Sequence, residues 1–386
     1  MSICGPIPVP GGRARCVSLA EIRDLPAWQE SFRAQAKDHR FYEIVEETLA
    51  GGFEHHYLVL EDDAGQVRGI QPFFFVQQNL LEGVPALLAV AATVRRRLPR
   101  FLTMRLLMVG CAAGEGHLGV CRAGDEEWVM RALHPALEVC AREGKASLVV
   151  FKDFAANYRD TFERFTANGY TRIPSMPYTR LALPFATFDE YFASLSKATR
   201  KDLRRKFRRA EKSAQLELQV VNDVSPWVDE IHPLYLEVQK RSAQKFETLT
   251  KEYFCSLGKR MPERVRFFLW RQESRIVAFS LCLIHNGTIY DDYLGLDYAV
   301  AFDLHLYFVT FRDIVRWALA NGLNFYYSSP LNYEPKLHLD CELAPLDLYV
   351  RHTSPWLNLI FPPLLQLLEP TRHDRVLRRF PNAHEL

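Results

Sequence analysis

The sequence predicts a mixed α/β (α+β) fold built from two similar units in tandem, each a mostly antiparallel twisted sheet flanked by helices. Both halves contain two β-rich runs joined by a tight polar turn. In both halves a helix-like segment also ends near a glycine and is followed by a short apolar run. Between the halves lies a strongly basic helical segment, which separates the two units.

The first unit is predicted to span residues 1–185. Apolar residues recur at helical spacing from about Leu25 to Leu49. The runs HHYLVLED and VRGIQPFFFVQQN, on either side of the turn DAGQ, predict a hairpin. The stretch WVMRALHPALEVCAREGKASLVVFKDF then predicts a helix and a strand. Roughly residues 80–126 have no counterpart in the second half, so we interpret them as an insertion.

The second unit, residues 186–386, begins with a basic helix predicted over residues 194–215. Leu203, Phe207, Ala210 and Ala214 recur at i, i+4, i+7 and i+11, which predicts one apolar face. The other faces carry Lys and Arg at nine positions between residues 197 and 212. Three interpretations of this run are open: a solvated face, a surface that binds the phosphate groups of a donor or an acceptor, or a nucleic-acid surface.

The region from Val265 to Pro330 is the predicted centre of the second unit. Three apolar runs separated by the turns QESR and HNG predict three antiparallel strands. A loop begins at Asp297, a helix-like segment ends at Asn321-Gly322, and the short run NFYYSS follows. The later stretch CELAPLDLYVRH predicts a last strand, so the order of elements repeats that of the first unit.

Composition narrows the classes of function. The 386 residues are 48% hydrophobic and 24% charged, as is ordinary for a globular protein, and the net charge of +2 gives no general reason to bind nucleic acid. The eight cysteines form no C-x-x-C pair, so no metal site is predicted. No apolar run reaches the roughly 18 residues of a spanning helix. Without a secretory leader, the protein is expected in the cytoplasm.

One apolar segment indicates a second possible location. Residues 355–370, PWLNLIFPPLLQLLEP, are apolar almost all round but too short to span a bilayer. Such a segment either packs in a core or lies on a lipid surface. We therefore expect that the protein can also associate peripherally with the inner membrane.

The basic helix and the strands after it resemble a known family. The matching elements are Ser196-Lys197 with the arginines from Arg200 to Arg209, the strands of Val265–Leu296, the helix of Leu304–Asn321, and Tyr333–Leu337. Together they resemble a tandem GNAT (Gcn5-related acyltransferase) fold of the FemAB/FemX-like and CelD/BcsL-type acyltransferases, a group that includes bacterial ceramide synthases. The resemblance covers most of residues 190–352, and the first half only by pattern.

The resemblance implies an N-acyltransferase that moves an acyl group from a thioester donor to a primary amine. Acyl-CoA is the implied co-substrate, with no permanently bound cofactor, and a lipid or sphingoid amine is the preferred acceptor. One alternative is a FemX-like transferase that uses aminoacyl-tRNA on a peptidoglycan or related precursor; nucleic acid is expected as a partner only in that case. A non-catalytic alternative is a degenerate scaffold at the membrane.

The family's glycine-rich pyrophosphate loop is absent here. The corresponding loop, from Asp297 to Asp303, contains no glycine, and its acidic ends oppose an anion. The basic helix is better suited to supply positive charge. The residues that we assign to binding the donor are Lys197, Arg200, Lys201, Arg204, Asp297 and Leu304.

Acyl transfer needs a base for the amine and hydrogen-bond donors for the carbonyl oxygen. Asp291 and Tyr293 are predicted to share one face of their strand, with Asp292 on the other. A histidine in the first turn of the helix would have a lowered pKa and act as a neutral base. The predicted catalytic residues are His305, Asp291, Tyr293, Glu334 and Lys336, the predicted substrate-binding residues are Asp292, Tyr333 and Tyr327, and no metal is expected.

Overall fold

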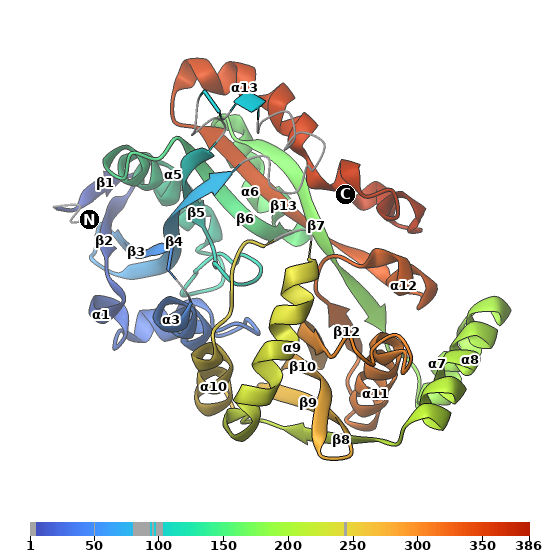
Figure 1. Ribbon diagram of the computed structural model, residues 1–386. Helices are drawn as coiled ribbons and strands as arrows, with labels where there is room; N and C mark the ends of the chain where they lie inside the picture. The colour runs from blue at the N-terminus through green and yellow to red at the C-terminus, as the bar shows by residue number, and fades with distance from the viewer. Residues whose placement is uncertain (1–4, 50, 80–92, 95, 98–102, 243–244) are drawn as a thin grey trace. The chain divides into compact units, whose positions relative to one another are not determined.

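Runs of strands and runs of helices follow each other along the chain in the computed structural model, which describes residues 5–49, 51–79, 93–94, 96–97, 103–242 and 245–386 (Figure 1). The chain forms two compact units. Unit 1 comprises residues 1–176, 345–375 and 386, and unit 2 comprises residues 177–344 and 376–385. The predicted mixed α/β class is confirmed.

The sheet of unit 1 has the strand order β1-β2-β3-β4-β5-β6-β13. All neighbours are antiparallel except β5 and β6, which are parallel. The predicted hairpin is β3 and β4, and it is confirmed. The strands are β1 (Ile7–Val9), β2 (Gly12–Val17), β3 (Glu54–Asp62), β4 (Val67–Asn79), β5 (Thr103–Val109), β6 (Leu148–Ala155) and β13 (Glu342–His352).

Helices cover both faces of this sheet. On one face, α5 packs with Phe73, Phe75 and Phe151 in an apolar core. On the other, the Trp28 ring of α2 lies 5.2 Å from the Tyr57 ring of β3. The helices are α1 (Leu19–Ile22), α2 (Pro26–Ser31), α3 (His39–Thr48), α5 (Glu126–Glu143), α6 (Arg159–Ala167) and α13 (Pro355–Leu368).

The sheet of unit 2 has the order β7-β12-β11-β10-β9-β8, again with one parallel pair, β11 with β12. The strands are β7 (Thr171–Ala182), β8 (Leu216–Val221), β9 (Val265–Gln272), β10 (Arg275–His285), β11 (Thr288–Leu296) and β12 (Phe325–Ser328). The helices are α7 (Phe188–Ser194), α8 (Lys197–Ser213), α9 (Val228–Arg241), α10 (Lys251–Arg260), α11 (Leu306–Ala320) and α12 (Tyr333–His338).

Different helices cover the two faces of the unit 2 sheet. On one face, the Phe254 ring of α10 lies 5.7 Å from Phe279 of β10. On the other, α8 and α11 share a core with Phe268 and Trp270. The predicted apolar face of α8 is confirmed, since Leu203, Phe207 and Ala210 are buried, with Ala214 packed beside them.

The compact units differ from the predicted division at residue 185. Strand β7, at the end of the first predicted unit, pairs with β12 in unit 2, from Ala182↔Phe325 to Thr179↔Ser328. Strand β13, from the second predicted unit, pairs with β6 in unit 1, from Leu346↔Ala155 to His352↔Leu148. Each half of the sequence thus gives its last strand to the other unit.

The proposed insertion also needs correction. Its residues 103–109 form β5, which pairs with β4 and β6 and corresponds in order to β11 of unit 2. The segment therefore includes a strand that both units need. Residues 80–92, 95 and 98–102 of this segment lie outside the described residues.

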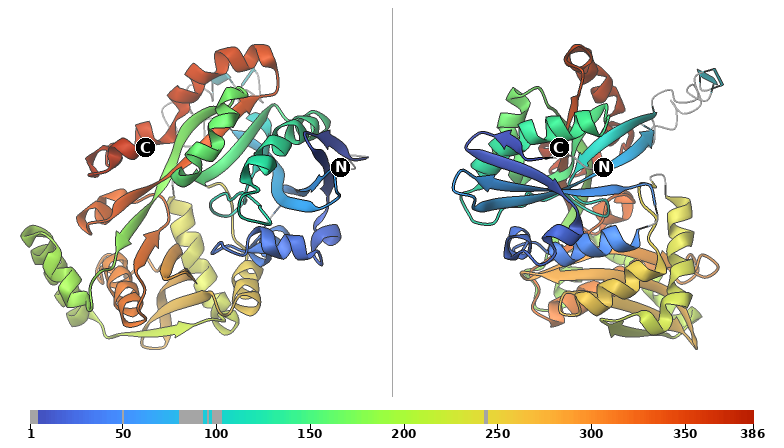
Figure 2. Two further views of the ribbon diagram at one scale, coloured as in Figure 1. Left: turned by 180° about the vertical axis from the view of Figure 1, so that it is seen from behind. Right: turned by 90° about the vertical axis from the view of Figure 1, so that its left-hand side faces the viewer.

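The apolar segment 355–370 forms α13, which is held to unit 1 by one side (Figure 2). The side chain of Asn358 donates to the Gly169 carbonyl at 2.8 Å and accepts from the His352 backbone N–H at 2.8 Å. Phe361 and Leu365 are buried, whereas Trp356, Leu359 and Ile360 are 81%, 74% and 68% exposed. In the described part of the chain, no helix is long and apolar enough to cross a bilayer.

Candidate active site

The candidate site lies in unit 2 where the parallel strands β11 and β12 part. Their pairing runs from Thr288↔Phe325 to Asp291↔Ser328, after which β11 continues to residue 296 and β12 ends. Pro330, two residues beyond the end of β12, has no N–H to donate and so cannot extend the ladder. The Ser329 N–H donates to the Asp291 carbonyl at 3.1 Å, which holds the start of the turn against β11.

A β-bulge shapes β11 at this point. Asp291 pairs with Cys282 and Tyr293 pairs with Leu281, so Asp292 is an extra residue in the register. Because Cys282 and Leu281 are adjacent in β10, their partners point to opposite faces of the sheet. The prediction that Asp291 and Tyr293 share a face is therefore wrong, since strict alternation does not survive a bulge.

Asp291 lies within a cluster of hydrogen-bonding groups. Its Oδ2 accepts from the Tyr326 hydroxyl at 2.7 Å, and its Oδ1 accepts from the Ser280 hydroxyl. Burial raises the pKa of the Asp291 carboxyl, and the bonds from Ser280 and Tyr326 partly oppose the rise. Asp291 can thus bind a proton more readily than an exposed aspartate can.

Lys336 of α12 belongs to the same cluster. Its side chain is almost fully buried, with 4% exposed, and its Nζ donates to the Ser329 carbonyl. Burial lowers the pKa of Lys336 to about 8, and the neighbouring carboxylate of Asp291 acts in the opposite direction. The ammonium group is therefore close to the balance between its charged and neutral forms near neutral pH.

This arrangement combines two functions that acyl transfer requires. A carboxylate with a raised pKa can accept a proton from an attacking amine. An ammonium group in a dry environment can donate a hydrogen bond to the oxygen that becomes negative in the transition state. The structure thus brings together two predicted catalytic residues, Asp291 and Lys336.

The other predicted residues near this region serve different contacts. On the opposite face, the Tyr293 hydroxyl donates to Glu247 at 2.9 Å, and Asp292 is buried in the bulge. The Tyr333 hydroxyl donates to the Pro177 carbonyl at 2.8 Å, and the Tyr327 ring lies 5.2 Å from Tyr290. Glu334 accepts from Arg379 at 2.5 Å.

His305 lies beside α8. It is the N-cap residue of α11, with a left-handed φ of 46°, and it does not occupy the first helical turn as predicted. The pKa of His305 is lowered as predicted, but by burial first and then by the cations of α8, Lys206 and Arg209 among them. In the part of the chain that the structure describes, the hydrogen-bonding partners and charged neighbours found for Asp291 and Lys336 do not include His305.

Hydrogen bonds and ion pairs hold the loop between β11 and α11. Asp297 accepts from the Ala299 N–H at 2.9 Å and forms an ion pair with Arg275 at 2.7 Å. Leu304 is 3% exposed and packs in the core. Asp303 forms an ion pair with Arg209 at 2.9 Å. These acidic groups, and a left-handed residue that is not glycine, make this helix start a poor cradle for phosphate.

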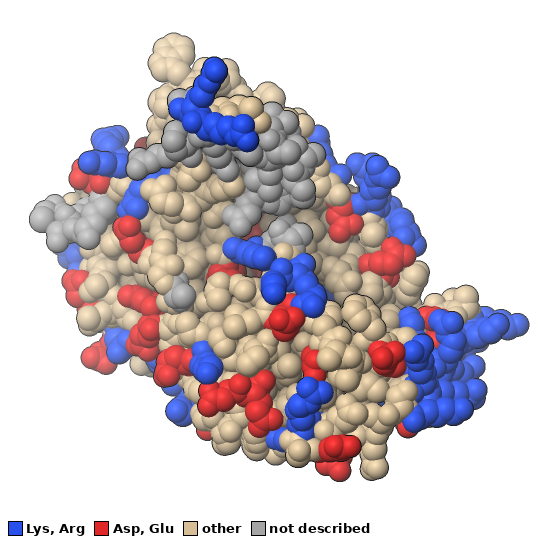
Figure 3. Space-filling model, viewed as in Figure 1, with Lys and Arg blue, Asp and Glu red and all other residues tan. Residues whose placement is uncertain are grey.

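The remaining predicted donor-binding residues lie on α8, where Lys and Arg side chains gather on one surface (Figure 3). Lys197, Lys201 and Arg204 are exposed. Arg200 instead donates to the carbonyls of Ala193, at 2.8 Å, and Leu195, at the end of α7. In the part of the chain that the structure describes, no group of three or more His, Cys, Asp and Glu residues is placed to hold a metal ion.

Tyr326 and Ser280 are the site residues that sequence reasoning missed. Ser280 is a fully buried polar residue within the otherwise apolar run IVAFSLCLI of β10. A buried hydroxyl in such a run requires a hydrogen-bonding partner, so the serine in this run indicates a polar group nearby. Tyr326 precedes Tyr327 in a four-residue strand, and only the pairing of that strand shows which tyrosine points inward.

Comparison with known proteins places the chain among FemAB-like proteins. The model of the FemAB-like family, described as peptidoglycan biosynthesis/recognition, matches residues 26–328. No curated protein sequence matches the chain.

Three solved structures are similar in fold. FemX is 12% identical, with a TM-score of 0.54 over 92% of this chain and 99% of FemX. L-PGS from Bacillus licheniformis is 12% identical, with a TM-score of 0.50 over 87% of this chain and 97% of L-PGS. A tandem GNAT protein from the clavulanic acid pathway is 10% identical, with a TM-score of 0.49 over 89% of this chain and 98% of that protein. At these identities the likeness concerns the fold alone.

Proposed function

The chain belongs to the FemAB-like family, and on this basis we propose that it transfers an acyl group from a thioester donor, acyl-CoA, to a primary amine. The observation that carries the proposal is the cluster of Asp291, Tyr326 and Lys336 where β11 and β12 part. In this cluster a proposed proton acceptor, Asp291, and a proposed hydrogen-bond donor, Lys336, are both at least partly shielded from solvent.

The proposed reaction uses these groups in order. The amine nitrogen attacks the thioester carbonyl and forms the new C–N bond, while Asp291 accepts the proton that the nitrogen loses. The Lys336 ammonium donates a hydrogen bond to the carbonyl oxygen as it becomes negative. The C–S bond then breaks, and the leaving thiolate takes up the proton that Asp291 had accepted, which restores the Asp291 carboxylate. The products are an amide and a free thiol.

For the acceptor, we favour an amine on a long apolar chain, such as a lipid or sphingoid amine. The support is α13, which exposes Trp356, Leu359, Ile360 and Leu367 along one side. An apolar stripe with a tryptophan suits the boundary between lipid headgroups and chains, so peripheral binding to a membrane would bring the enzyme to such an acceptor.

A second candidate is an aminoacyl-tRNA-dependent transferase. Two observations favour it: the loop from Asp297 to Asp303 contains no glycine to cradle a pyrophosphate, and α8 carries nine Lys and Arg residues that gather on one surface (Figure 3). The acceptor would still be an amine, and the same cluster would act on an ester instead of a thioester.

An assay of both donors tests the proposal. Purified protein is incubated with labelled acyl-CoA or with charged tRNA and a panel of long-chain and soluble amines, and amides are detected by mass spectrometry. We expect an N-acyl amide from acyl-CoA, lost in Lys336→Ala. Activity with charged tRNA only, abolished by RNase, would select the second candidate. No product from either donor, and no thermal shift with any CoA thioester, would favour the non-catalytic scaffold.

A further inference from the structure

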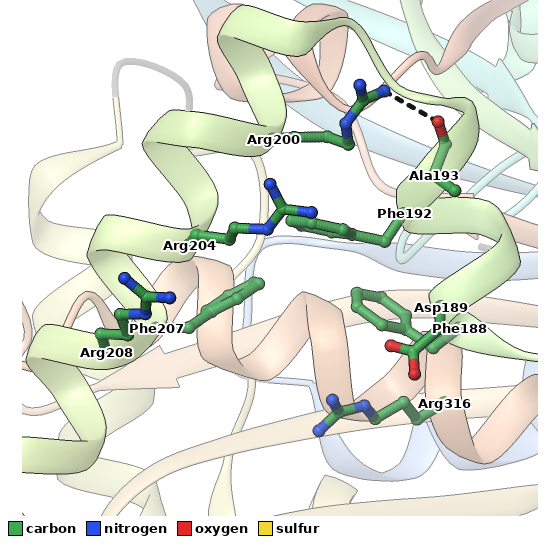
Figure 4. Close-up of a pocket in the computed structure, with 9 residues that line it drawn as sticks. All are labelled: Phe188, Asp189, Phe192, Ala193, Arg200, Arg204, Phe207, Arg208 and Arg316. Carbon is green, nitrogen blue, oxygen red and sulfur yellow. Dashed lines mark hydrogen bonds between the residues drawn. The ribbon is translucent and has the colours of Figure 1, made fainter.

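A basic groove lies between α7 and α8, on the side of α8 that faces α7 (Figure 4). Its volume is about 550 Å³, within the usual range for small-molecule sites. Its lining combines three phenylalanines with four arginines and one acidic residue. The lining residues are Phe188, Asp189, Phe192, Ala193, Arg200, Arg204, Phe207, Arg208 and Arg316.

The arginines of α8 form a regular row along the groove. Arg200, Arg204 and Arg208 are four residues apart, so each step along the helix axis is about 6 Å. Figure 4 shows their guanidinium groups following one side of α8. A row with this spacing can contact phosphate groups that follow each other along a ligand.

Two guanidinium groups lie over aromatic rings. Arg204 lies 5.2 Å from the centre of the Phe192 ring, and Arg316 of α11 lies 5.0 Å from the centre of Phe188. A guanidinium group over a ring still has N–H groups that can donate to a phosphate. The groove thus contains N–H groups that can donate hydrogen bonds to phosphate, and aromatic rings beside them.

The charges of the groove are poorly balanced by the protein. Among the described residues, Arg204 and Arg208 have no carboxylate within 4 Å, and Arg316 has only Asp313 at 3.9 Å. On the rest of α8, Arg205 pairs with Asp202 at 2.6 Å and Arg209 with Asp303 at 2.9 Å. The cations of α8 without a carboxylate partner therefore include two of the three arginines that line the groove.

We infer that this groove binds the phosphate groups and base of a nucleotide. The inference rests on the proposed function, in which both candidate donors carry a nucleotide: the adenosine diphosphate part of CoA, or the terminal nucleotides of an RNA. The start of α11 lacks a site for phosphate, because its loop contains Asp297 and Asp303 and no glycine. The arginines of the groove supply such a site. In this inference the arginines on the α7-facing side of α8 hold the donor's phosphates, and the loop that precedes α11 does not.

A lipid surface fits this groove less well. Phe188 and Phe207 are 7% and 9% exposed, so they form a floor and do not project. None of the large exposed apolar side chains of the described residues lies on α7 or α8. The groove therefore has cations and stacking surfaces but nothing to insert among acyl chains.

Binding measurements with two charge-matched double variants test the inference. Arg204→Ala/Arg208→Ala removes two cations of the groove, and Arg205→Ala/Lys212→Ala removes two cations of α8 that do not line it. The titrated ligands are 3′,5′-ADP and a single-stranded hexa-adenylate RNA, at fixed salt because both interactions depend on ionic strength. Circular dichroism melts confirm that both variants are folded.

We expect the groove variant to bind at least tenfold more weakly than the wild type, and the control variant to change by less than threefold. The ligand that the wild type binds identifies the donor: 3′,5′-ADP for CoA, the oligonucleotide for RNA. Equal losses in the two variants, or no binding of either ligand by the wild type, would overturn the inference.

The acyl-transfer assay separates this inference from the proposed function. If the groove variant loses nucleotide binding but the wild type forms no amide, the groove stands and the proposed function fails. If the wild type forms an amide and both double variants bind nucleotides equally, the function stands and the groove assignment fails.

Discussion

Replacing Lys336 with methionine should stabilise the protein and inactivate it. Burial lowers the pKa of Lys336 from the ordinary 10.5 to about 8. At about 1.4 kcal/mol per tenfold change in proton affinity, keeping this group charged in the folded state costs about 3 kcal/mol. Methionine has a similar length and no charge, so Lys336→Met removes this cost. It also loses the hydrogen bond to the partly exposed Ser329, worth about 1 kcal/mol.

The net expectation at pH 7 is a gain of about 2 kcal/mol in the free energy of unfolding. This gain in stability should decrease as the pH rises above about 8. Between about pH 8 and 10.5 the unfolded wild type still holds the proton that the folded form has released, so wild-type stability rises with pH. The advantage of the variant should therefore shrink above pH 8 and reverse to about −1 kcal/mol near pH 10.5.

Urea unfolding of both proteins at several pH values between 7 and 10.5, with an acyl-transfer assay at pH 7, measures these effects. Lys259→Met, at an exposed position of α10, is the matched control and should change stability by less than about 0.5 kcal/mol. A variant that is less stable than the wild type at pH 7, by an amount that stays constant up to pH 10, would refute the argument. Full activity in Lys336→Met would refute the role of the ammonium group.

Four further experiments test the site and its support. Asp291→Asn should lower kcat/KM for the amine about 100-fold, measured with saturating donor, because the amide cannot accept the proton; activity within threefold of the wild type would contradict this. Tyr326→Phe removes a bond that holds the pKa of Asp291 down, so the acidic limb of the pH–rate profile should move to higher pH; an unchanged limb would count against the pairing. His305→Ala should reduce turnover less than threefold while Lys336→Ala reduces it more than tenfold, since the contacts of His305 are with α8; equal losses would place His305 in the chemistry. Phe207→Ala should destabilise the protein by about 3 kcal/mol in urea unfolding, because its ring is buried beneath α8; a change below 1 kcal/mol would show that α8 is loosely packed.

Local patterns predicted most elements of the fold. Alternating apolar runs around short polar turns predicted the β3–β4 and β9–β10 hairpins, and apolar spacing predicted α8 with Leu203 and Phe207 inward. These features depend on residues close together in the sequence. The strand β5 was not predicted because the local pattern of residues 80–126, in which it lies, does not resemble any segment of the second half.

The predictions that were wrong or missing depend on residues that are far apart in the sequence. The faces of Asp291 and Tyr293 are set by the bulge in the register with β10, which periodicity alone does not reveal. The place of Tyr326 in the site follows from pairing between β11 and β12, whose partners are over thirty residues apart. Lys336 was predicted from its position after a strand, but only the fold shows that its side chain is buried.

The exchange of β7 and β13 has a consequence for synthesis on the ribosome. Arg159 and Asp347, which form an ion pair at 2.7 Å within unit 1, are 188 positions apart in the sequence. Unit 1 therefore cannot complete its sheet until nearly the whole chain has been made, and unit 2 needs a strand that was made long before it. Neither half could be expressed alone, or moved by recombination, as an independently folding module. Evolutionary change in one half is consequently constrained by the sheet that it completes in the other.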